Sequence, residues 1–206
     1  MKKIIVSSMN KNQISGVVDV HLEAFPGFFL SFLGKQFLKE FYIGVIEDPS
    51  GIARVVADGQ ALIGFVAGIT QPSGFYRRLL MKRWWRFGLA AIPAVIKKPA
   101  IIPRLFRAFS RPATPLPCEN CGTLMSIAVR PQAEGGGVGR KLGEAFLFEA
   151  QKRGLSAVNL TTDALDNDRV NRFYQRLGFE KFRTFTTPEG RLMNEYVFYF
   201  QPIKTE

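Results

Sequence analysis

The chain has few cysteine and histidine residues: two cysteines and one histidine in 206 residues. Two cysteines cannot build a disulfide framework, and one histidine leaves too few ligands for an ordinary structural zinc site. Cys118 and Cys121 form a lone Cys-x-x-Cys pair without a nearby histidine. We interpret them as reduced thiols in a proline-rich loop, with a redox disulfide as the alternative. We expect no metal.

Long apolar runs are also missing. The apolar stretch from Phe28 to Ile46 is interrupted by Lys35, Lys39 and Glu40, so it falls short of the ~20 apolar residues that a membrane-spanning helix needs. The first residues offer only a three-residue apolar run before Ser7, which is too short for the core of a signal peptide. We therefore expect a cytoplasmic protein, which could still bind peripherally to the inner face of a membrane.

Acidic residues are scarce, with 17 Asp and Glu against 28 Lys and Arg, which gives a formal net charge of +11. Ten of the basic residues lie in residues 75–118, which contain no Asp or Glu. We call this segment the basic insertion. A helical wheel predicts an apolar face and a basic face in its first part, with prolines from Pro93 onward cutting the rest into short pieces. The predicted apolar face holds Tyr76, Leu80, Met81, Trp84, Trp85 and Phe87, and the predicted basic face holds Arg78, Lys82, Arg83 and Arg86.

Three interpretations of the basic insertion stay open. Aromatic and aliphatic side chains opposite Arg and Lys are typical of a segment that lies on an anionic membrane surface, here through residues 75–111. The favoured interpretation is this membrane-surface segment or, with the same residues, a lid over an acceptor site. An acidic soluble partner or substrate is the second interpretation. Nucleic acid, on whose bases the aromatic rings could stack, is the least favoured.

What the chain does have is enough apolar surface to fold: 47% hydrophobic and 13% aromatic residues, including nineteen Phe. This composition excludes a chain that is disordered throughout, and the length fits a single domain over residues 1–206 with the insertion at about 75–118. The predicted fold is α/β, with a mixed, mostly antiparallel central sheet and flanking helices. We predict strands at Lys3–Ser7, 52–70 (a hairpin), Thr123–Val129, Leu155–Thr162, 180–187 and 191–200, and helices at Ile14–Ala24, Leu30–Tyr42, Arg140–Lys152 and Asn167–Leu177.

A glycine-rich loop separates the strand at Thr123–Val129 from the helix that follows it. Gly135, Gly136, Gly137 and Gly139 lack the side chains that would block close approach, and Arg140 adds a positive charge. Such a loop directs several backbone N–H groups at one point, near the positive end of the helix dipole. It predicts a phosphate or pyrophosphate site, although a flexible turn is the alternative. No Gly-Lys-Ser/Thr follows, so it is not a Walker loop.

A second segment, residues 167–179, follows the next predicted strand, and the two segments together resemble the GNAT superfamily of acyl-CoA-dependent N-acyltransferases. The superfamily's cofactor loop, Gln/Arg-x-x-Gly-x-Gly/Ala after a strand that ends in Ala-Val and Pro, falls on residues 134–139. Its later pattern falls on Asn167, Val170, Phe173, Tyr174, Gly178 and Phe179. The resemblance covers about 120–180, extends to 52–70 and 180–200, and does not include the basic insertion.

The resemblance implies an N-acetyltransferase that moves an acetyl group from acetyl-CoA directly to a primary amine. The pantetheine arm would lie along the strand, the N–H of Val129 would polarise the thioester carbonyl, and Tyr174 would protonate the departing thiolate. An amino sugar, lipid-linked or phosphate-bearing, would suit the basic insertion as acceptor. The residues expected to bind the cofactor are Ile127, Ala128, Val129, Glu134, Gly135, Gly136, Gly137, Val138, Gly139, Arg140, Asn167 and Phe173.

Two departures from the pattern matter. Glu134 replaces the usual Gln or Arg, which predicts weaker binding of the pyrophosphate. The strand before the loop offers Thr123 and Ser126, neither of them acidic, so the general base must come from elsewhere.

For that base we favour Glu23, because the resemblance places the first two helices beside the acceptor site. Asp163 or a chain of waters are the alternatives, and His21 is interpreted as a structural residue. The competing function is a non-catalytic module that binds acyl-CoA or docks to a membrane or an acidic partner. A homodimer is left open.

Overall fold

The computed structural model describes residues 4–59, 61–97 and 120–201, and within them seven strands form one sheet in the order β1-β2-β3-β4-β5-β7-β6. Every neighbouring pair is antiparallel except β4 and β5, which are parallel. The predicted mixed, mostly antiparallel α/β fold is confirmed. The strands are β1 (Val6–Ser8), β2 (Gly51–Asp58), β3 (Ala61–Ile69), β4 (Cys121–Val129), β5 (Ala157–Asp163), β6 (Glu180–Thr186) and β7 (Leu192–Tyr199).

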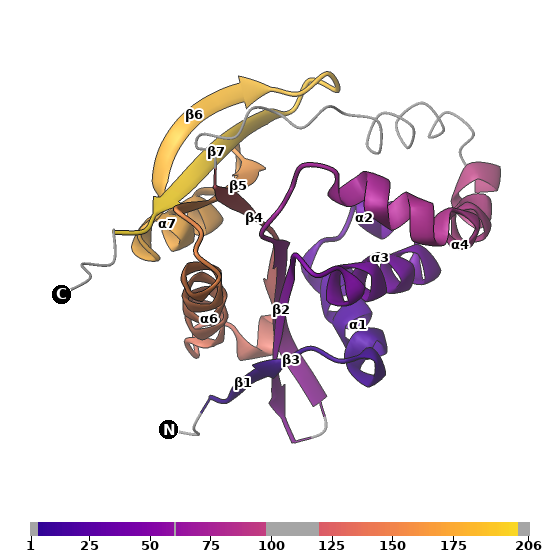
Figure 1. Ribbon diagram of the computed structural model, residues 1–206, viewed down its shortest axis with the longest axis horizontal. Helices are drawn as coiled ribbons and strands as arrows, with labels where there is room; N and C mark the ends of the chain where they lie inside the picture. Colours follow the sequence, from indigo (N-terminus) through magenta and orange to yellow (C-terminus); the bar gives the residue numbers. More distant parts are fainter. Residues whose placement is uncertain (1–3, 60, 98–119, 202–206) are drawn as a thin grey trace.

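Helices cover both faces of the sheet (Figure 1). One face carries α1 (Ile14–Ala24), α2 (Phe29–Phe32), α3 (Lys35–Glu47) and α4 (Phe75–Lys97), and the other carries α6 (Val138–Lys152) and α7 (Asp168–Arg176). Alternation along β3 explains why both faces are apolar: Phe65 and Ala67 pack in the core beneath α1 and α3, whereas Val66 packs in the core beneath α6. Two short 3-10 helices, Lys11–Gln13 and Pro131–Ala133, complete the described elements.

The helix predicted over Leu30–Tyr42 is two helices, α2 and α3. Gly34, at the N-cap of α3, has a φ of 90°, a left-handed conformation that ends any regular α-helix. Leu33, next to this break, is buried in the core. The spacing of the apolar residues continues through this break, so the sequence pattern did not reveal the break.

The first part of the basic insertion is a single 23-residue helix, α4, which continues through Pro93. The predicted break at this proline is therefore wrong. The residues of α4 around Pro93 that face the core are Ala90, Ala91 and Ala94, all buried, and packing against the core outweighs the backbone hydrogen bond that proline removes. In the described part of the chain, no helix is both long enough and apolar enough to cross a membrane.

The predicted faces of α4 are correct only in part, because Phe87 is buried in the core but other residues of the predicted apolar face are not. The face that packs on the core contains Phe75, Leu79, Phe87 and the three alanines, whereas Met81, Trp84 and Trp85 are exposed. Arg83, on the predicted basic face, has a side chain that is only 12% exposed and that contacts Glu40 and Glu47 of α3, at 2.5 Å each. The acids that balance this helix thus come from another element, which a wheel drawn for one helix cannot show.

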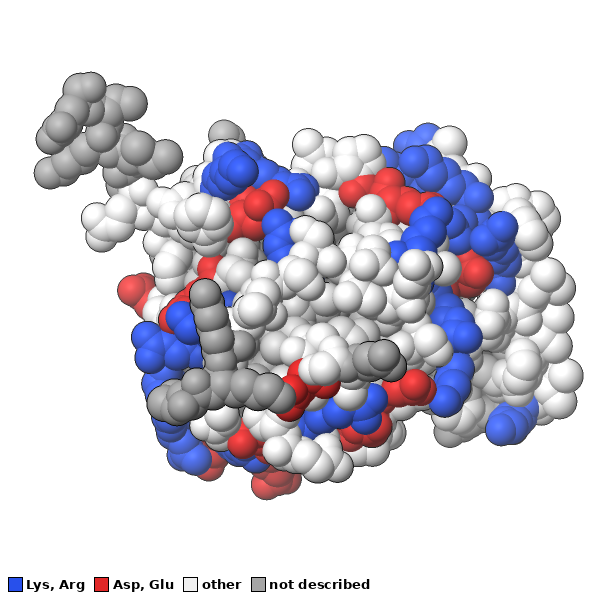
Figure 2. All heavy atoms as spheres, turned by 90° about the horizontal axis from the view of Figure 1, so that it is seen from below, with Lys and Arg blue, Asp and Glu red and all other residues white. Residues whose placement is uncertain are grey.

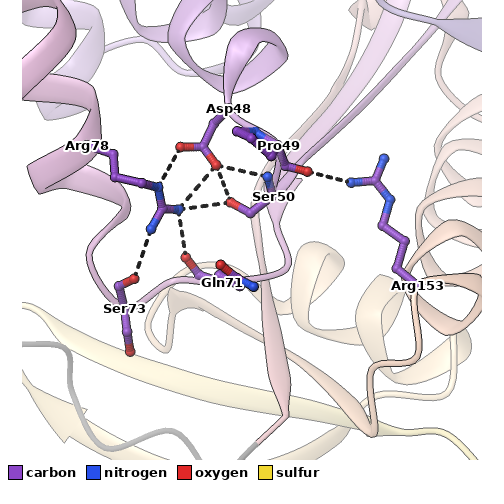
Figure 3. Close-up of polar contacts among 7 residues, drawn as sticks. All are labelled: Asp48, Pro49, Ser50, Gln71, Ser73, Arg78 and Arg153. Atoms are coloured by element: carbon purple, nitrogen blue, oxygen red, sulfur yellow. Dashed lines mark hydrogen bonds and ion pairs between the residues drawn. The ribbon is translucent and has the colours of Figure 1, made fainter.

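A polar cluster fixes the N-terminal end of α4 to the turn between α3 and β2 (Figure 3). Arg78 donates to both carboxylate oxygens of Asp48, at 2.8 and 3.2 Å, and to the hydroxyl of Ser50 at 3.1 Å. The same guanidinium reaches the carbonyls of Gln71 and Ser73, at 3.3 Å each. The start of α4 is therefore held in place by side-chain contacts as well as by its apolar face.

Candidate functional site

The candidate site is the gap that opens between β4 and β5. These strands are paired at only three positions, from Cys121↔Ala157 to Thr123↔Asn159, after which they separate. On its other side β4 stays paired with β3 as far as Val129. Among the described residues, the part of β4 from 124 to 129 therefore has no strand partner on the side of β5.

The backbone of β4 presents hydrogen-bonding groups to this gap. The N–H of Arg130 donates to the carbonyl of Ile63 at 2.8 Å, so Arg130 directs its backbone groups toward β3. Backbone groups alternate sides along a strand. Ala128 consequently faces β3, whereas Ile127 and Val129 turn their N–H and C=O groups into the gap. An extended ligand could add to β4 there as another strand would.

A β-bulge in β4 shapes the side of the gap that faces α1 and α3. The pairing with β3 shifts between Ala67↔Ser126 and Gly68↔Leu124, which leaves Met125 as an extra residue. Met125 packs against the core beneath α1 and α3, and Ser126 hydrogen-bonds to Tyr42 of α3. Two successive residues thus lie on the same face, which strict alternation would forbid.

The glycine-rich loop lies at the far end of the gap, after Val129. Gly135 and Gly137 have φ values of 78° and 80°, and Gly137 is the N-cap of α6, which begins at Val138, two residues before the predicted start. A Cβ on Gly139 would lie 3.4 Å from the ring of Phe173 and 3.6 Å from the side chain of Val129. The end of β4, the start of α6 and α7 therefore meet at this glycine.

Glu134 has a partner that the sequence did not reveal. Its carboxylate lies 2.6 Å from the guanidinium of Arg169, in the first turn of α7. Arg140 is 74% exposed at the start of α6, where it pairs with Glu144 at 2.8 Å. The loop that we expect to bind pyrophosphate is thus not left with an unbalanced negative charge.

Tyr174 lies on the side of α7 that packs against the sheet. Its ring contacts those of Phe173, Phe179 and Tyr196, and 7% of the residue is exposed. Burial raises the pKa of its phenol well above the usual value, so the hydroxyl keeps its proton at neutral pH. Among the described residues we find no hydrogen-bond partner for this hydroxyl.

Asn167 contacts β5. Its side-chain amide donates to Thr162 Oγ1 at 2.8 Å and to the carbonyl of Asp163 at 3.1 Å. Asn171, one turn later, donates to the same carbonyl at 3.0 Å. Asn167 therefore holds α7, and with it Tyr174, against the end of β5.

The candidate bases are all engaged with other side chains. Glu23 forms an ion pair with Arg130, the residue after β4, beside an open pocket of about 330 Å³ at the α1 side. Both carboxylate oxygens of Asp163 accept from Nη2 of Arg191, at 2.7 Å each. Of these two carboxylates, Glu23 is the one next to β4.

His21 is buried among aromatic rings. Its Nδ1 lies 2.7 Å from the hydroxyl of Tyr42, its Nε2 has no described partner, and burial lowers its pKa to about 4. A neutral imidazole that is 3% exposed matches the structural role that we expected.

A polar network lies where β4 and β5 separate, and the sequence did not predict it. Thr123 donates to Asn159 at 2.7 Å, Asn159 donates to Glu195 at 2.9 Å, and Arg183 donates to the other oxygen of Glu195 at 2.6 Å. It joins β4, β5, β7 and β6 where β4 and β5 part. The available signal was an asparagine and a glutamate inside otherwise apolar strands.

Cys121 is buried at the start of β4, and Cys118, the other cysteine of the Cys-x-x-Cys pair, lies outside the described residues. Within the described ranges, no three His, Cys, Asp or Glu side chains are grouped so as to hold a metal ion.

Comparison with known proteins agrees with this geometry. The model of the Acetyltransferase (GNAT) family matches residues 16–179. A mycothiol acetyltransferase of Rhodococcus jostii is 43% identical over 63 residues, 31% of this chain and 20% of the relative. One of Actinosynnema mirum is 37% identical over 65 residues, 32% of this chain and 22% of the relative. The chain spans about a fifth of the length of these relatives.

Solved structures share the whole fold at low sequence identity. An aminoglycoside 6'-N-acetyltransferase complexed with coenzyme A superposes with a TM-score of 0.63 at 15% identity, over 96% of this chain and 98% of that one. The ribosomal-protein-S18-alanine N-acetyltransferase of Escherichia coli gives a TM-score of 0.58 at 14% identity, over 99% of each chain.

Proposed function

The chain belongs to the GNAT family of acetyltransferases, and from this premise we propose that it transfers the acetyl group of acetyl-CoA directly to a primary amine. The observation that carries the proposal is the gap between β4 and β5, with the backbone of Ile127 and Val129 turned into it and a glycine-rich helix start at its end. A reaction that uses acetyl-CoA is consistent with the cytoplasmic location expected from the sequence.

Each part of the gap would hold a different part of acetyl-CoA, which supplies the activated acetyl group. Ile127 and Val129 would pair with the amides of the pantetheine arm, and the N–H groups of residues 135–139, with Arg140, would bind the pyrophosphate. Ala128, Val138 and Phe173 would lie along this path, and Arg169 balances the charge of Glu134 beside it. The backbone N–H of Val129, aimed at the thioester oxygen, would stabilise the developing oxyanion. This contact would lower the activation free energy by about 3 kcal/mol.

Proton transfer would use one residue on each side of the gap. Tyr174, whose buried phenol keeps its proton, would donate it to the departing thiolate. Glu23 would accept the proton that the amine loses, with Arg130 fixing the direction of its carboxylate. No covalent intermediate on the protein is needed.

We propose a small-molecule amine as acceptor, with amino sugars as the first class to test. The partial relatives are named mycothiol acetyltransferases, and a structure with this fold is named an aminoglycoside 6'-N-acetyltransferase. An acceptor that carries phosphate would also fit the cations of the basic insertion.

The test is the substitution Tyr174→Phe. We expect the variant to bind CoA within about twofold of the wild type, because the phenol hydroxyl is the only group removed. Its kcat in an acetyl-CoA thiol-release assay with an amine panel should fall by about 10²-fold or more, the usual range for a lost general acid.

Tyr199→Phe is the matched control, since Tyr199 is 51% exposed on β7, and it should keep full activity. Equal loss in both variants, or an unchanged kcat in Tyr174→Phe, would refute the assigned role. CoA binding without turnover of any amine would favour the non-catalytic module instead.

A further inference from the structure

The helix α4 carries a second apolar stripe, opposite the one that packs on the core. Met81, Trp85, Leu89, Ile92 and Ile96 follow one another at helical spacing and are 47–74% exposed. Trp84, beside them, is 68% exposed. This stripe runs over four turns of a preformed helix, and in its middle Trp85 and Leu89 also border an open pocket beside α3.

Basic side chains border the stripe. Arg77 and Lys82 lie on its two sides, Lys97 lies at the end of the helix, and Arg86 lies over the ring of Trp85 at 5.0 Å. Figure 2 shows uncharged surface bordered by Lys and Arg at the end of the molecule where α4 lies in Figure 1. The helix itself contains no Asp or Glu.

The acidic side chains near α4 pair mainly with Arg78 and Arg83 rather than with the cations that border the stripe. Asp48 is bound by Arg78, and Glu40 and Glu47 are bound by Arg83. Arg86 reaches Glu40 only at 3.8 Å, and among the described residues Arg77 and Lys82 have no ion-pair partner. The outward side of the helix thus combines apolar side chains with positive charge that the described residues leave unbalanced.

We propose that α4 docks on the surface of a bilayer rich in anionic phospholipid, with its axis in the membrane plane. The exposed Trp, Leu and Ile side chains would enter the boundary between headgroups and acyl chains, and the bordering cations would lie at the level of the phosphates. A second copy of the same face is disfavoured because it would bring cations against cations.

The helix is ready for this contact before a membrane is present. Its inner face is packed on the core, and the Arg78–Asp48 cluster holds its first turns. Docking therefore does not need the coil-to-helix transition that an isolated amphipathic peptide undergoes at a bilayer. The proposal does not depend on the acetyltransferase reaction, because none of the stripe residues lies at the gap between β4 and β5.

The protein contains its own reporter for the test. Trp84 and Trp85 are its only tryptophans, so tryptophan emission reports on α4 alone. The full chain is titrated with phosphatidylglycerol vesicles and with phosphatidylcholine vesicles. We expect a blue shift with the anionic vesicles, quenching by brominated acyl chains, and at least tenfold stronger partitioning than into neutral vesicles.

Charge substitutions locate the contact. Leu89→Glu and Ile96→Glu, at exposed positions, should each weaken vesicle binding at least tenfold. Phe148→Glu also replaces an exposed apolar side chain with Glu, but on α6, where Phe148 is 70% exposed. This variant should bind vesicles within twofold of the wild type. Lys82→Gln should weaken binding more than Lys152→Gln, which lies at the end of α6.

Equal partitioning into neutral and anionic vesicles would overturn the proposal, as would unchanged binding by Leu89→Glu and Ile96→Glu. A response to heparin without a response to vesicles would identify an acidic soluble partner and also overturn it. Vesicle-free acetyl transfer to an amine without phosphate should be the same in Leu89→Glu, Ile96→Glu and the wild type, so that failure of this proposal and failure of the proposed reaction are distinguished.

Discussion

At the scale of single residues, His21 gives the chain a pH dependence that can be traced to one side chain. It is the only histidine, it is buried, and its pKa is lowered to about 4. The unfolded chain, with a histidine pKa of about 6.5, therefore binds this proton more readily than the folded chain does. Folding stability should be highest above pH 7 and should fall as the pH drops from 6.5 toward 4.

The expected loss between pH 8 and pH 5.5 is about 1.4 kcal/mol in the free energy of unfolding, a range in which ordinary carboxylates barely titrate. Urea unfolding at several pH values measures it. His21→Gln should remove this slope, whatever it does to the absolute stability. A variant that keeps the wild-type slope would show that another group is responsible.

Motifs predicted which residues surround the candidate site, but not what those residues contact. The position of Tyr174 on the helix after β5 follows from the spacing of the pattern that contains it. The ion pair of Glu134 with Arg169 does not, because it depends on how closely α7 approaches the loop. The same holds for the Asn159–Glu195 contact, which joins strands 36 residues apart.

At the scale of elements, α4 depends on Asp48. Burial alone raises the pKa of this carboxyl, but hydrogen bonds from Arg78 and Ser50 outweigh burial and lower the pKa to about 2. Because the folded value lies below the unfolded value of about 3.9, the interaction stabilises the protein above pH 4. This stability is lost as the pH falls toward 2.

Asp48→Asn should therefore lower the free energy of unfolding by about 2 kcal/mol at pH 7, because Arg78 loses its charged partner in a site where Asp48 is only 7% exposed. Chemical denaturation measures the change. Asp19→Asn is the control: the Asp19–Lys35 pair is 2.9 Å long but exposed, and its loss should cost less than about 1 kcal/mol. Equal effects in the two variants would contradict the assigned role of Asp48.

The sequence analysis was wrong about α4 for a physical reason. A helical wheel assumes one apolar side and one polar side, whereas α4 has apolar residues on both. Alanines and phenylalanines pack on the core, and Trp, Ile and Met side chains remain outside. Only the three-dimensional packing shows which of two apolar stripes is the buried one.

At the scale of the whole molecule, binding of acetyl-CoA should raise the thermal stability. At about 100 times its dissociation constant a ligand that binds only the folded state stabilises it by about 2.7 kcal/mol, which corresponds to roughly 5–10 °C in Tm for a chain of this size. Differential scanning fluorimetry at fixed salt measures the shift.

Inorganic phosphate and ADP are the controls, because a protein with a net charge of +11 binds anions loosely. They should give much smaller shifts than acetyl-CoA. Equal shifts for all three ligands would indicate general anion binding and would count against the pyrophosphate site.

The fold class was predictable because alternating apolar and polar residues, separated by turn residues, recur along nearly the whole chain. Each of the two motifs also falls at a junction between a strand and a helix. The gap between β4 and β5 was not predictable from these patterns. It depends on where two distant strands stop pairing and on the extra residue at Met125, both of which are set by register across the sheet.

The short pairing of β4 with β5 also divides the sheet into two parts. One part, β1 to β4, carries α6, and the other, β5 to β7, carries α7, and three residue pairs join the two parts of the sheet. Beyond these pairs the two parts are joined by side-chain packing, because one apolar cluster includes Phe146 of α6, Val158 of β5 and Tyr196 of β7. The feature that leaves room for a cofactor thus makes the cohesion of the two parts depend on that shared cluster more than on backbone pairing.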